Sequence, residues 1–274
     1  MLRSLYSGVS GMRGFQTKLD VIGNNIANVN TIGFKAGRAM FKDILSQTVA
    51  GVTAPTDDTA GGVNAKQIGL GVTLASVDTI HTPGSAMTTN VPTDLRIDGD
   101  GFFAVRAGAD QETPYLTRAG NFTVDANRNL VNADGLFVLS TAGDQIVIGE
   151  EVTAFSIAQD GTIIAVNTDG TSAPTEFQIS VVKVVNPGGL EKIGGNLYRV
   201  TPNANPEGLL DEFTLANDPA LGTGAIVSGQ LEMSNVDLTG EFTEMIVAQR
   251  GFQANSRIIT TSDEILQEVV NLKR

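Results

Sequence analysis

Few residues of this 274-residue chain have the types and spacing that catalysis or ligand binding requires. The Gly99–Ala104 segment, Gly-Asp-Gly-Phe-Phe-Ala, matches the G-x-G-x-x-A pattern of a dinucleotide-binding loop. That loop works only where a helix begins after it, because the helix N-terminus holds the pyrophosphate. The residues that follow, Phe102–Val105, have the composition of a strand. We therefore do not expect a nucleotide site there.

The same segment carries two carboxylates, Asp98 and Asp100, in the order Asp-Gly-Asp-Gly. A calcium-binding EF-hand loop needs an acidic residue eleven positions after its first ligand, and Ala109 stands there instead. A carboxylate pair could also hydrolyse glycosides, but aspartate next to glycine is the ordinary composition of a tight turn. We therefore expect neither a calcium site nor a catalytic pair.

His81 is the sole histidine, and the chain has no cysteine and no tryptophan. A histidine-based triad therefore has one candidate, and a histidine pair for a metal has none. The missing cysteines exclude disulfides, thiolate zinc sites, iron–sulfur clusters and cysteine nucleophiles. We expect His81 to lie in a loop or on the surface, and we predict a protein that is not an enzyme and uses no cofactor and no metal.

Charge is unevenly distributed along the chain, which has a formal net charge of −12. Residues 1–47 carry +4, residues 236–274 carry −2, and the residues between them carry −14. A nucleic-acid coat would need a basic face, so no nucleic-acid partner is expected. No run of about 18 apolar residues is present, and the first residues lack an apolar signal-peptide core. Neither membrane insertion nor a cleaved secretory signal is expected.

Both ends of the chain have the apolar spacing of long amphipathic helices. In residues 2–29 apolar side chains alternate at intervals of three and four, as in a coiled-coil seam, and the helix is expected to end near Asn28–Gly33. The tail repeats this pattern over residues 238–270, where Asn235 or Asp237 can cap the first turn. The predicted assembly seam consists of Leu5, Val9, Met12, Leu19, Ile22 and Ile26 in the head and Phe242, Met245, Phe252, Ile259 and Leu266 in the tail.

Glycines weaken the head helix. Gly8, Gly11, Gly14 and Gly23 each cost about 1 kcal/mol relative to alanine in a helix interior. Such a helix forms reliably only when something packs against it, and small residues allow a close approach, a role that we assign to Gly8, Gly11 and Gly23. Two arrangements stay open: a hairpin of head and tail helices within one chain, or ordering of both helices on assembly with other copies.

The middle of the chain has the pattern of antiparallel β-structure. Short apolar runs such as Phe102–Val105 and Ile163–Val166 recur from about residue 70 to residue 233. Asp-Gly pairs at 98–99, 100–101, 134–135, 160–161 and 169–170 are typical of tight turns between strands. The chain is therefore predicted to be α+β. Its expected parts are a helical assembly domain of residues 1–34 and 236–274, an extended linker or loop over 35–70, and a β-rich outer domain over 71–235.

Three segments carry a resemblance to a known family. The Leu19–Lys35 segment resembles the N-terminal signature of bacterial flagellar rod and hook proteins, and Met245–Ser256 resembles their C-terminal signature. Thr117–Thr123, together with Asp134–Gly135, is similar to a segment of the family's β domain. These matches lie at both ends and in the interior of the chain, in the family's order.

The resemblance implies a homo-polymer in the bacterial flagellum. Such subunits leave through the flagellar type III export apparatus and add beneath a cap at the growing tip. Head and tail helices then form an inner tube, and the β domain faces outward. Neighbouring rod or hook–filament junction proteins are the further partners that it implies. It also implies that Phe41 and Leu45 form an export-gate signal, for which an amphipathic turn packed on the linker is the alternative interpretation.

Three functions stay open at this point. The first is a hook subunit, part of the flexible tubular joint that transmits motor torque to the filament. Its support is the Lys66–Gly71 segment, which is similar to the compact hook proteins of Gram-positive bacteria. The second is a distal-rod subunit, part of the rigid drive shaft of the basal body. The third is a secreted β-rich carbohydrate-binding module, although three tyrosines and no tryptophan are few for an aromatic cleft.

Overall fold

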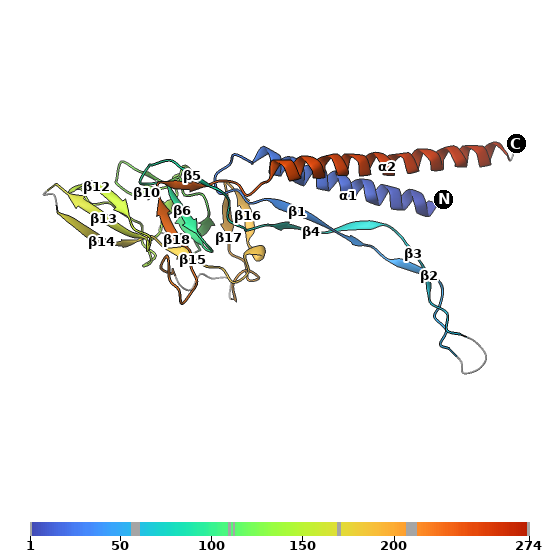
Figure 1. The fold of residues 1–274 in the computed structure, drawn as a ribbon, viewed down its shortest axis with the longest axis horizontal. Helices are drawn as coiled ribbons and strands as arrows, with labels where there is room; N and C mark the ends of the chain where they lie inside the picture. Colours follow the sequence, from blue (N-terminus) through green and yellow to red (C-terminus); the bar gives the residue numbers. More distant parts are fainter. Residues whose placement is uncertain are drawn as a thin grey trace. The chain divides into compact units, whose positions relative to one another are not determined.

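The computed structural model describes residues 2–55, 61–108, 111, 113–168, 171–206 and 213–272. The chain divides into two compact units, and Figure 1 labels both long helices and many of the strands. Unit 1 consists of Met1–Ala27, Gly37–Thr79 and Asp237–Arg274, and unit 2 consists of Asn28–Ala36 and Ile80–Val236. Within the described ranges, no helix combines the length and the apolar character that crossing a membrane requires.

Unit 1 is built on two long helices that lie side by side (Figure 1). Helix α1 spans Leu2–Ala27 and helix α2 spans Leu238–Asn271. They pack antiparallel, because Gly8 of α1 meets Ile259 of α2 while Asn25 meets Glu241. At ~1.5 Å per residue they are about 39 Å and about 51 Å long. As the sequence predicts, Asp237 caps α2, and its carboxylate accepts a hydrogen bond from the Thr239 N–H at 3.0 Å.

A two-stranded ribbon also belongs to unit 1. Strand β1 (Gly37–Asp43) pairs with β4 (Val72–Thr79), and β2 (Ser46–Ala50) pairs with β3 (Lys66–Gly69), both antiparallel. The sequence predicts an extended linker or loop over residues 35–70, and strands β1, β2 and β3 take up about half of its described residues. The physical reason is that its two arms can satisfy each other's backbone hydrogen-bonding groups, which an extended single strand leaves to water.

Unit 2 contains an eight-stranded antiparallel sheet in the order β16-β17-β8-β7-β11-β10-β9, with β15 paired to β7. Its strands are β7 (Phe102–Arg106), β8 (Tyr115–Thr117), β9 (Thr123–Val124), β10 (Leu130–Val131), β11 (Phe137–Val138), β15 (Val181–Val182), β16 (Glu191–Gly194) and β17 (Leu197–Arg199). A 3-10 turn, Pro187–Gly189, precedes β16.

Smaller antiparallel sheets complete the described part of unit 2. One has three strands in the order β12-β13-β14, and two are pairs, β18 with β6 and β19 with β5. Their bounds are β5 (Ala86–Thr88), β6 (Leu95–Asp98), β12 (Val152–Ile157), β13 (Thr162–Asn167), β14 (Ser172–Gln178), β18 (Ala225–Ser228) and β19 (Gln230–Glu232).

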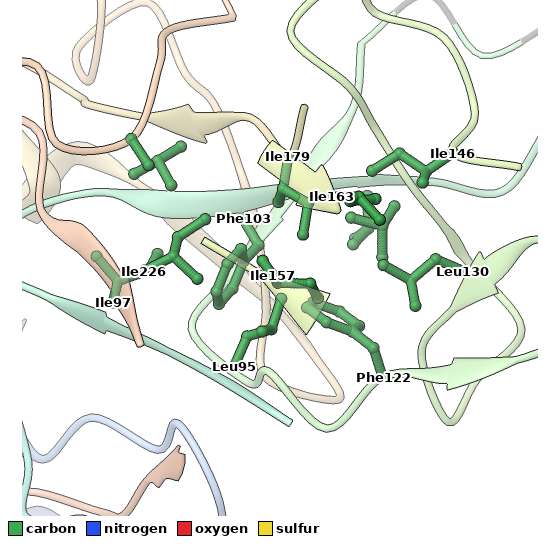
Figure 2. Packing of buried hydrophobic residues seen from close by; sticks show 14 residues of the cluster. Leu95, Ile97, Phe103, Phe122, Leu130, Ile146, Ile157, Ile163, Ile179 and Ile226 are labelled. Atoms are coloured by element: carbon green, nitrogen blue, oxygen red, sulfur yellow. The ribbon is translucent and has the colours of Figure 1, made fainter. Parts of the chain in front are cut away.

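Strand β7 divides the core of unit 2. Phe103 and Val105 point into a cluster that Figure 2 shows, where the rings of Phe103 and Phe122 meet edge to face with centroids 5.2 Å apart. Phe102 and Ala104 point the opposite way, into a second cluster with Tyr198. Since side chains of a strand alternate between its faces, a strand buried on both faces reads as a continuous apolar run. Phe102–Val105 is a continuous apolar run because β7 is buried on both faces.

The Asp-Gly pairs do not all make the same kind of turn. Gly135, with φ of 78°, joins β10 to β11, and Gly161, with φ of 84°, joins β12 to β13, so both are turns between paired strands as predicted. The pairs within Asp98–Gly101 instead join β6 to β7, which belong to different sheets. The remaining pair, Asp169–Gly170, lies outside the described residues, as does Ala109.

The architecture is therefore α+β, with helices at both ends and antiparallel β-structure between them. The residues after Gly101 form strand β7 and not a helix, so the dinucleotide pattern there lacks its helix N-terminus. The coiled-coil geometry of the helix pair stays a prediction.

Candidate functional site

Small residues lie where α1 and α2 meet in unit 1. A Cβ atom added at Gly8 would lie 3.5 Å from the Ile259 side chain, and one added at Gly11 would lie 2.8 Å from the Asn255 side chain. On the facing helix, a Cβ atom at Gly251 would lie 2.5 Å from the ring of Phe15. Glycine is therefore used on both helices to bring the two backbones close.

The predicted seam residues are divided between this helix interface and solvent. Ile22 is buried, and the half-buried set comprises Leu5, Met12, Leu19, Ile26, Met245, Ile259 and Leu266. Val9, Phe242 and Phe252 are 37%, 50% and 37% exposed. The fully buried residue in this part of α2 is Ala248. Because large rings would hold the helices apart, small residues occupy the contact face, and Phe242 and Phe252 lie beside it.

Gly23 differs from the other two glycines that we expect to pack closely. Among the described residues, nothing lies within 4 Å of a Cβ atom added at Gly23. The described part of a single chain therefore packs nothing closely against Gly23, and a close contact there stays a prediction for the assembled protein. Gly14 does have a neighbour, since an added Cβ atom would lie 3.0 Å from the Phe41 ring.

The residues of the implied export signal lie in and after the ribbon strand β1. The rings of Phe41 in β1 and Phe15 in α1 pack against each other, with centroids 6.3 Å apart and an angle of 50° between their planes. Leu45 lies between β1 and β2 and is 69% exposed. Phe41 therefore has a structural use against α1, while Leu45 remains accessible in this chain.

A buried asparagine fastens three elements of unit 1 together. Asn25, near the end of α1, is 1% exposed. Its side-chain oxygen accepts from the Gly37 N–H at 2.9 Å, and its amide donates to the Gly37 carbonyl at 2.8 Å and to the Glu241 carboxylate at 2.9 Å. Burial raises the pKa of Glu241, and the Asn25 hydrogen bond opposes that rise. Lys18 forms an ion pair with Glu244 beside it.

In unit 2, three segments far apart in the sequence meet at one point. Gly33, with φ of 69°, donates its N–H to the Glu232 carbonyl at 2.8 Å, and a Cβ atom added to it would lie 2.6 Å from the Ala119 nitrogen. Only glycine fits this position, because it combines a left-handed backbone with close backbone contact. The head signature, the Thr117–Thr123 segment and β19 are thereby joined.

The same place holds a buried charge cluster of Lys35, Arg118 and Glu232. Their side chains are 0%, 3% and 1% exposed. Lys35 Nζ lies 2.5 Å from Glu232 Oε1 and donates to the Thr82 carbonyl at 2.7 Å. Arg118 Nη1 lies 3.3 Å from Glu232 Oε2, and Arg118 Nη2 donates to the Gly99 carbonyl at 2.8 Å. One carboxylate thus serves two cations.

Burial and pairing act in opposite directions on this cluster. Burial lowers the pKa of Lys35 and of Arg118, and the Glu232 charge works against both changes. Glu232 also accepts from the Gly84 N–H at 3.0 Å. Removal of a single partner would leave an uncompensated buried charge, which is among the most costly changes a fold can suffer.

Asn235 adds further hydrogen bonds beside the buried charge cluster. Its side-chain oxygen accepts from the Ala36 N–H at 2.8 Å, and its amide donates to the Ile80 carbonyl at 2.8 Å. Lys192 lies over the ring of Phe34, 4.2 Å from the centroid. Sequence reasoning missed Glu232 and considered Asn235 only as a helix cap, because their partners lie about 110 to 200 positions away and no local pattern connects them.

His81 lies in a loop, which is one of the two expected places, but it is not exposed. It is half-buried, and its ring meets those of Phe102 and Tyr198 edge to face at centroid distances of 5.6 Å and 5.5 Å. Burial, with the charges of Lys35, Arg118 and Lys192, lowers its pKa to about 4. Within the described residues no group of three or more histidine, aspartate or glutamate side chains is arranged to hold a metal.

Close helix packing and the Asn25 hydrogen bonds thus stabilise unit 1, and the buried charge cluster with Asn235 stabilises unit 2. Three family models match the chain in sequence order. They are described as "Flagella basal body rod protein" over residues 5–35, "Flagellar hook protein FlgE/F/G D1 domain" over 96–165 and "Flagellar basal body rod FlgEFG protein C-terminal" over 227–272.

Full-length relatives agree with these matches. The chain is 56% identical to the flagellar basal-body rod protein FlgG of Bacillus subtilis over 275 positions, covering 100% of both chains. It is 37% identical to the protein of the same name from Borreliella burgdorferi over 278 positions, and 29% identical to that organism's flagellar hook protein FlgE over 452 positions, again covering 100% of each. The chain belongs to the flagellar rod and hook protein family.

Family membership assigns the chain to the structural components of the flagellar rod and hook. The third function left open by the sequence, a secreted carbohydrate-binding module, receives no support from any of these matches.

Proposed function

We propose that the chain is a rod subunit of the flagellar basal body, most similar in role to the distal-rod proteins, and that it polymerises through α1 and α2. The observation that carries this proposal is the 56% identity to a basal-body rod protein over 275 positions, an alignment that covers 100% of both chains. Alignment with the hook protein takes 452 positions for a chain of 274, so it requires long gaps. Rod therefore replaces hook as the preferred function.

The exposed apolar surface of unit 1 supports assembly with other copies. Helix α2 exposes large apolar side chains, among them Phe242, Ile246, Val247, Ile265 and Val269. A soluble helix normally keeps such residues on its covered face. Exposed large apolar side chains in this number favour an interface with another protein.

The exposed surface of the ribbon also supports assembly with other copies. Strands β2 and β3 are almost fully exposed and include Val49, at 63%, and Ile68, at 47%. A two-stranded hairpin without a covering layer is at best marginally stable in water. A groove of about 440 Å³ between α1 and the ribbon, lined by Tyr6, Val9 and Leu74 among others, offers a further apolar contact.

An interface that joins different surfaces of successive copies does not close on itself, and it generates a helical polymer. We assign the helices to the inside of that polymer and unit 2 to its outer surface, where neighbouring subunits meet. Export through the flagellar type III apparatus and growth beneath a cap belong to the same proposal, as do contacts with adjoining rod and junction proteins.

The test is to locate the chain in isolated hook–basal bodies. An epitope tag in the β13–β14 connection would be labelled with antibody fragments and imaged by electron microscopy. We expect label on the straight shaft. Label confined to the curved segment outside the envelope would make the chain a hook subunit, and label on neither part would contradict the proposal altogether.

A further inference from the structure

A small cavity in unit 2 lies next to the buried charge cluster. Its volume is about 150 Å³, and it is lined by His81, Asp100, Phe102, Arg118, Lys183 and Pro187, together with adjacent backbone. Phe102 and Arg118 are buried and form its floor, while Asp100 and Lys183 are exposed at its rim. The cavity therefore reaches from solvent to the Arg118 guanidinium.

One buried donor of the lining has no hydrogen-bond partner: among the described residues, no atom pairs with Arg118 Nε. His81 Nδ1 also lacks a partner there, but the neutral ring uses its one N–H on the Pro187 backbone, so Nδ1 is an acceptor and does not bind an anion. The Arg118 side chain is 3% exposed, and its two other nitrogens bind Glu232 and Gly99. A buried polar group without a partner costs about 1–3 kcal/mol, so a ligand that supplied an acceptor here would recover that free energy.

Positive charge is concentrated around this cavity within an acidic unit. Unit 2 as a whole carries eight basic and nineteen acidic side chains. At the cavity, Arg118 and Lys183 face Asp100, and the Lys183 ammonium uses one of its donors on the Leu221 carbonyl at 3.0 Å. Burial is the largest cause of the low pKa of His81, and the charges of Lys35, Arg118 and Lys192 lower it further.

Size narrows the ligand class. A volume of about 150 Å³ corresponds to on the order of five water molecules at roughly 30 Å³ each. Sites for drug-sized or cofactor-sized molecules span about 300–1,000 Å³. The hydrogen-bond donors, positive charge and small volume of the cavity together favour a small, negatively charged ligand group that accepts hydrogen bonds.

We propose that the cavity bounded by His81, Arg118 and Lys183 binds one small oxyanion, a carboxylate or phosphate group. Arg118 Nε at the floor and the free donors of Lys183 at the rim hold its oxygen atoms. The group comes either from a free anion or from an acidic side chain of a second copy of the chain. This inference does not depend on the proposed function, because the first arm of its test uses the soluble protein.

The first arm titrates inorganic phosphate, and separately acetate, into the soluble chain at constant ionic strength with chloride as reference. His81 is the sole histidine, so its ring signals in NMR spectra report on the cavity without ambiguity. We expect a saturable shift of those signals. Lys183→Gln should weaken binding on the order of tenfold or more, since a hydrogen bond to a charged group contributes about 1.5–3 kcal/mol.

Arg199→Gln is the matched control, because Arg199 is an exposed cation of the same unit that pairs with Glu191 away from the cavity. It should bind phosphate as the unchanged chain does. A shift that does not saturate, that chloride reproduces, or that persists unchanged in Lys183→Gln would overturn the proposal.

The second arm repeats the phosphate titration on assembled protein. Loss of phosphate binding on assembly identifies an acidic side chain of a neighbouring copy as the natural ligand, whereas retained binding identifies a free anion. Failure to assemble at all would count against the proposed function and leave the result of the first arm in force.

Discussion

Glu232 should be the most sensitive single position in unit 2. Its carboxylate compensates two buried cations, Lys35 at 2.5 Å and Arg118 at 3.3 Å, and also accepts from the Gly84 N–H. Glu232→Gln keeps the shape and removes the charge. Breaking a buried ion pair by removing one partner costs about 3–5 kcal/mol, a large part of the roughly 5–15 kcal/mol that stabilises a typical domain.

The assay is urea unfolding, followed by hydrogen exchange of β7 amides, which reports on unit 2 alone. We expect the unfolding free energy measured there to fall by about 3–5 kcal/mol in Glu232→Gln. The matched control is Glu191→Gln, because Glu191 is an exposed acid of the same unit that pairs with Arg199. It should show no measurable loss.

A double-mutant cycle separates the pair from its surroundings. Lys35→Met combined with Glu232→Gln should cost less than the sum of the two single changes, by about 0.5–3 kcal/mol. Equal stability of Glu232→Gln and Glu191→Gln, or strict additivity with Lys35→Met, would refute the assignment of a compensating role to Glu232.

Three further outcomes are expected. NMR titration should give His81 a pKa near 4, and a pKa near 6.5 would contradict its burial. The free energy of unfolding should fall as the pH drops from about 6.5 towards 4, because the unfolded chain takes up the proton at a higher pH than the folded chain. His81→Gln should make this fall smaller. Gly11→Ala should lower the melting temperature, because its Cβ atom meets the Asn255 side chain. Gly23→Ala, where an added Cβ atom meets no atom of the described residues, should raise stability by about 0.5–1 kcal/mol. A Gly11→Ala variant more stable than Gly23→Ala would refute the helix contact at Gly11. Leu19→Asp should abolish polymerisation in a sedimentation assay while Gln16→Asp, at an exposed position of α1, does not; normal assembly of the first would remove Leu19 from the interface.

Local pattern was enough for the elements whose geometry is local. Apolar spacing predicted both long helices, and the end of α1 at Ala27 agrees with the Asn28–Gly33 stop signal. Asp237 was one of two predicted caps and is the observed one. Periodicity placed Phe242 and Phe252 on the assembly seam; both are exposed in the single chain, and their contact with a neighbouring copy stays a prediction.

Long-range partners could not be predicted in the same way. Lys35 stands next to an apolar run, and nothing near it in sequence indicates a buried position or a carboxylate 197 residues away. The sequence predicts an extended linker or loop over residues 35–70, since residues 50–64 are small, polar and turn-rich. The pairing of β1 with β4 and of β2 with β3 is a tertiary property that no local pattern shows. The resemblance of Leu19–Lys35 and Thr117–Thr123 to family signatures identified segments that the structure brings together, without giving the reason for their contact.

Electron cryomicroscopy of the polymer formed by the purified chain tests the central claim most directly. A rod subunit that assembles through its helices should give a straight tube, with α1 and α2 lining the inside and the exposed apolar face of α2, including Phe242 and Ile246, buried between copies. A curved tube would identify a hook subunit. A chain that stays monomeric under assembly conditions, or a polymer in which that face remains in solvent, would contradict the account.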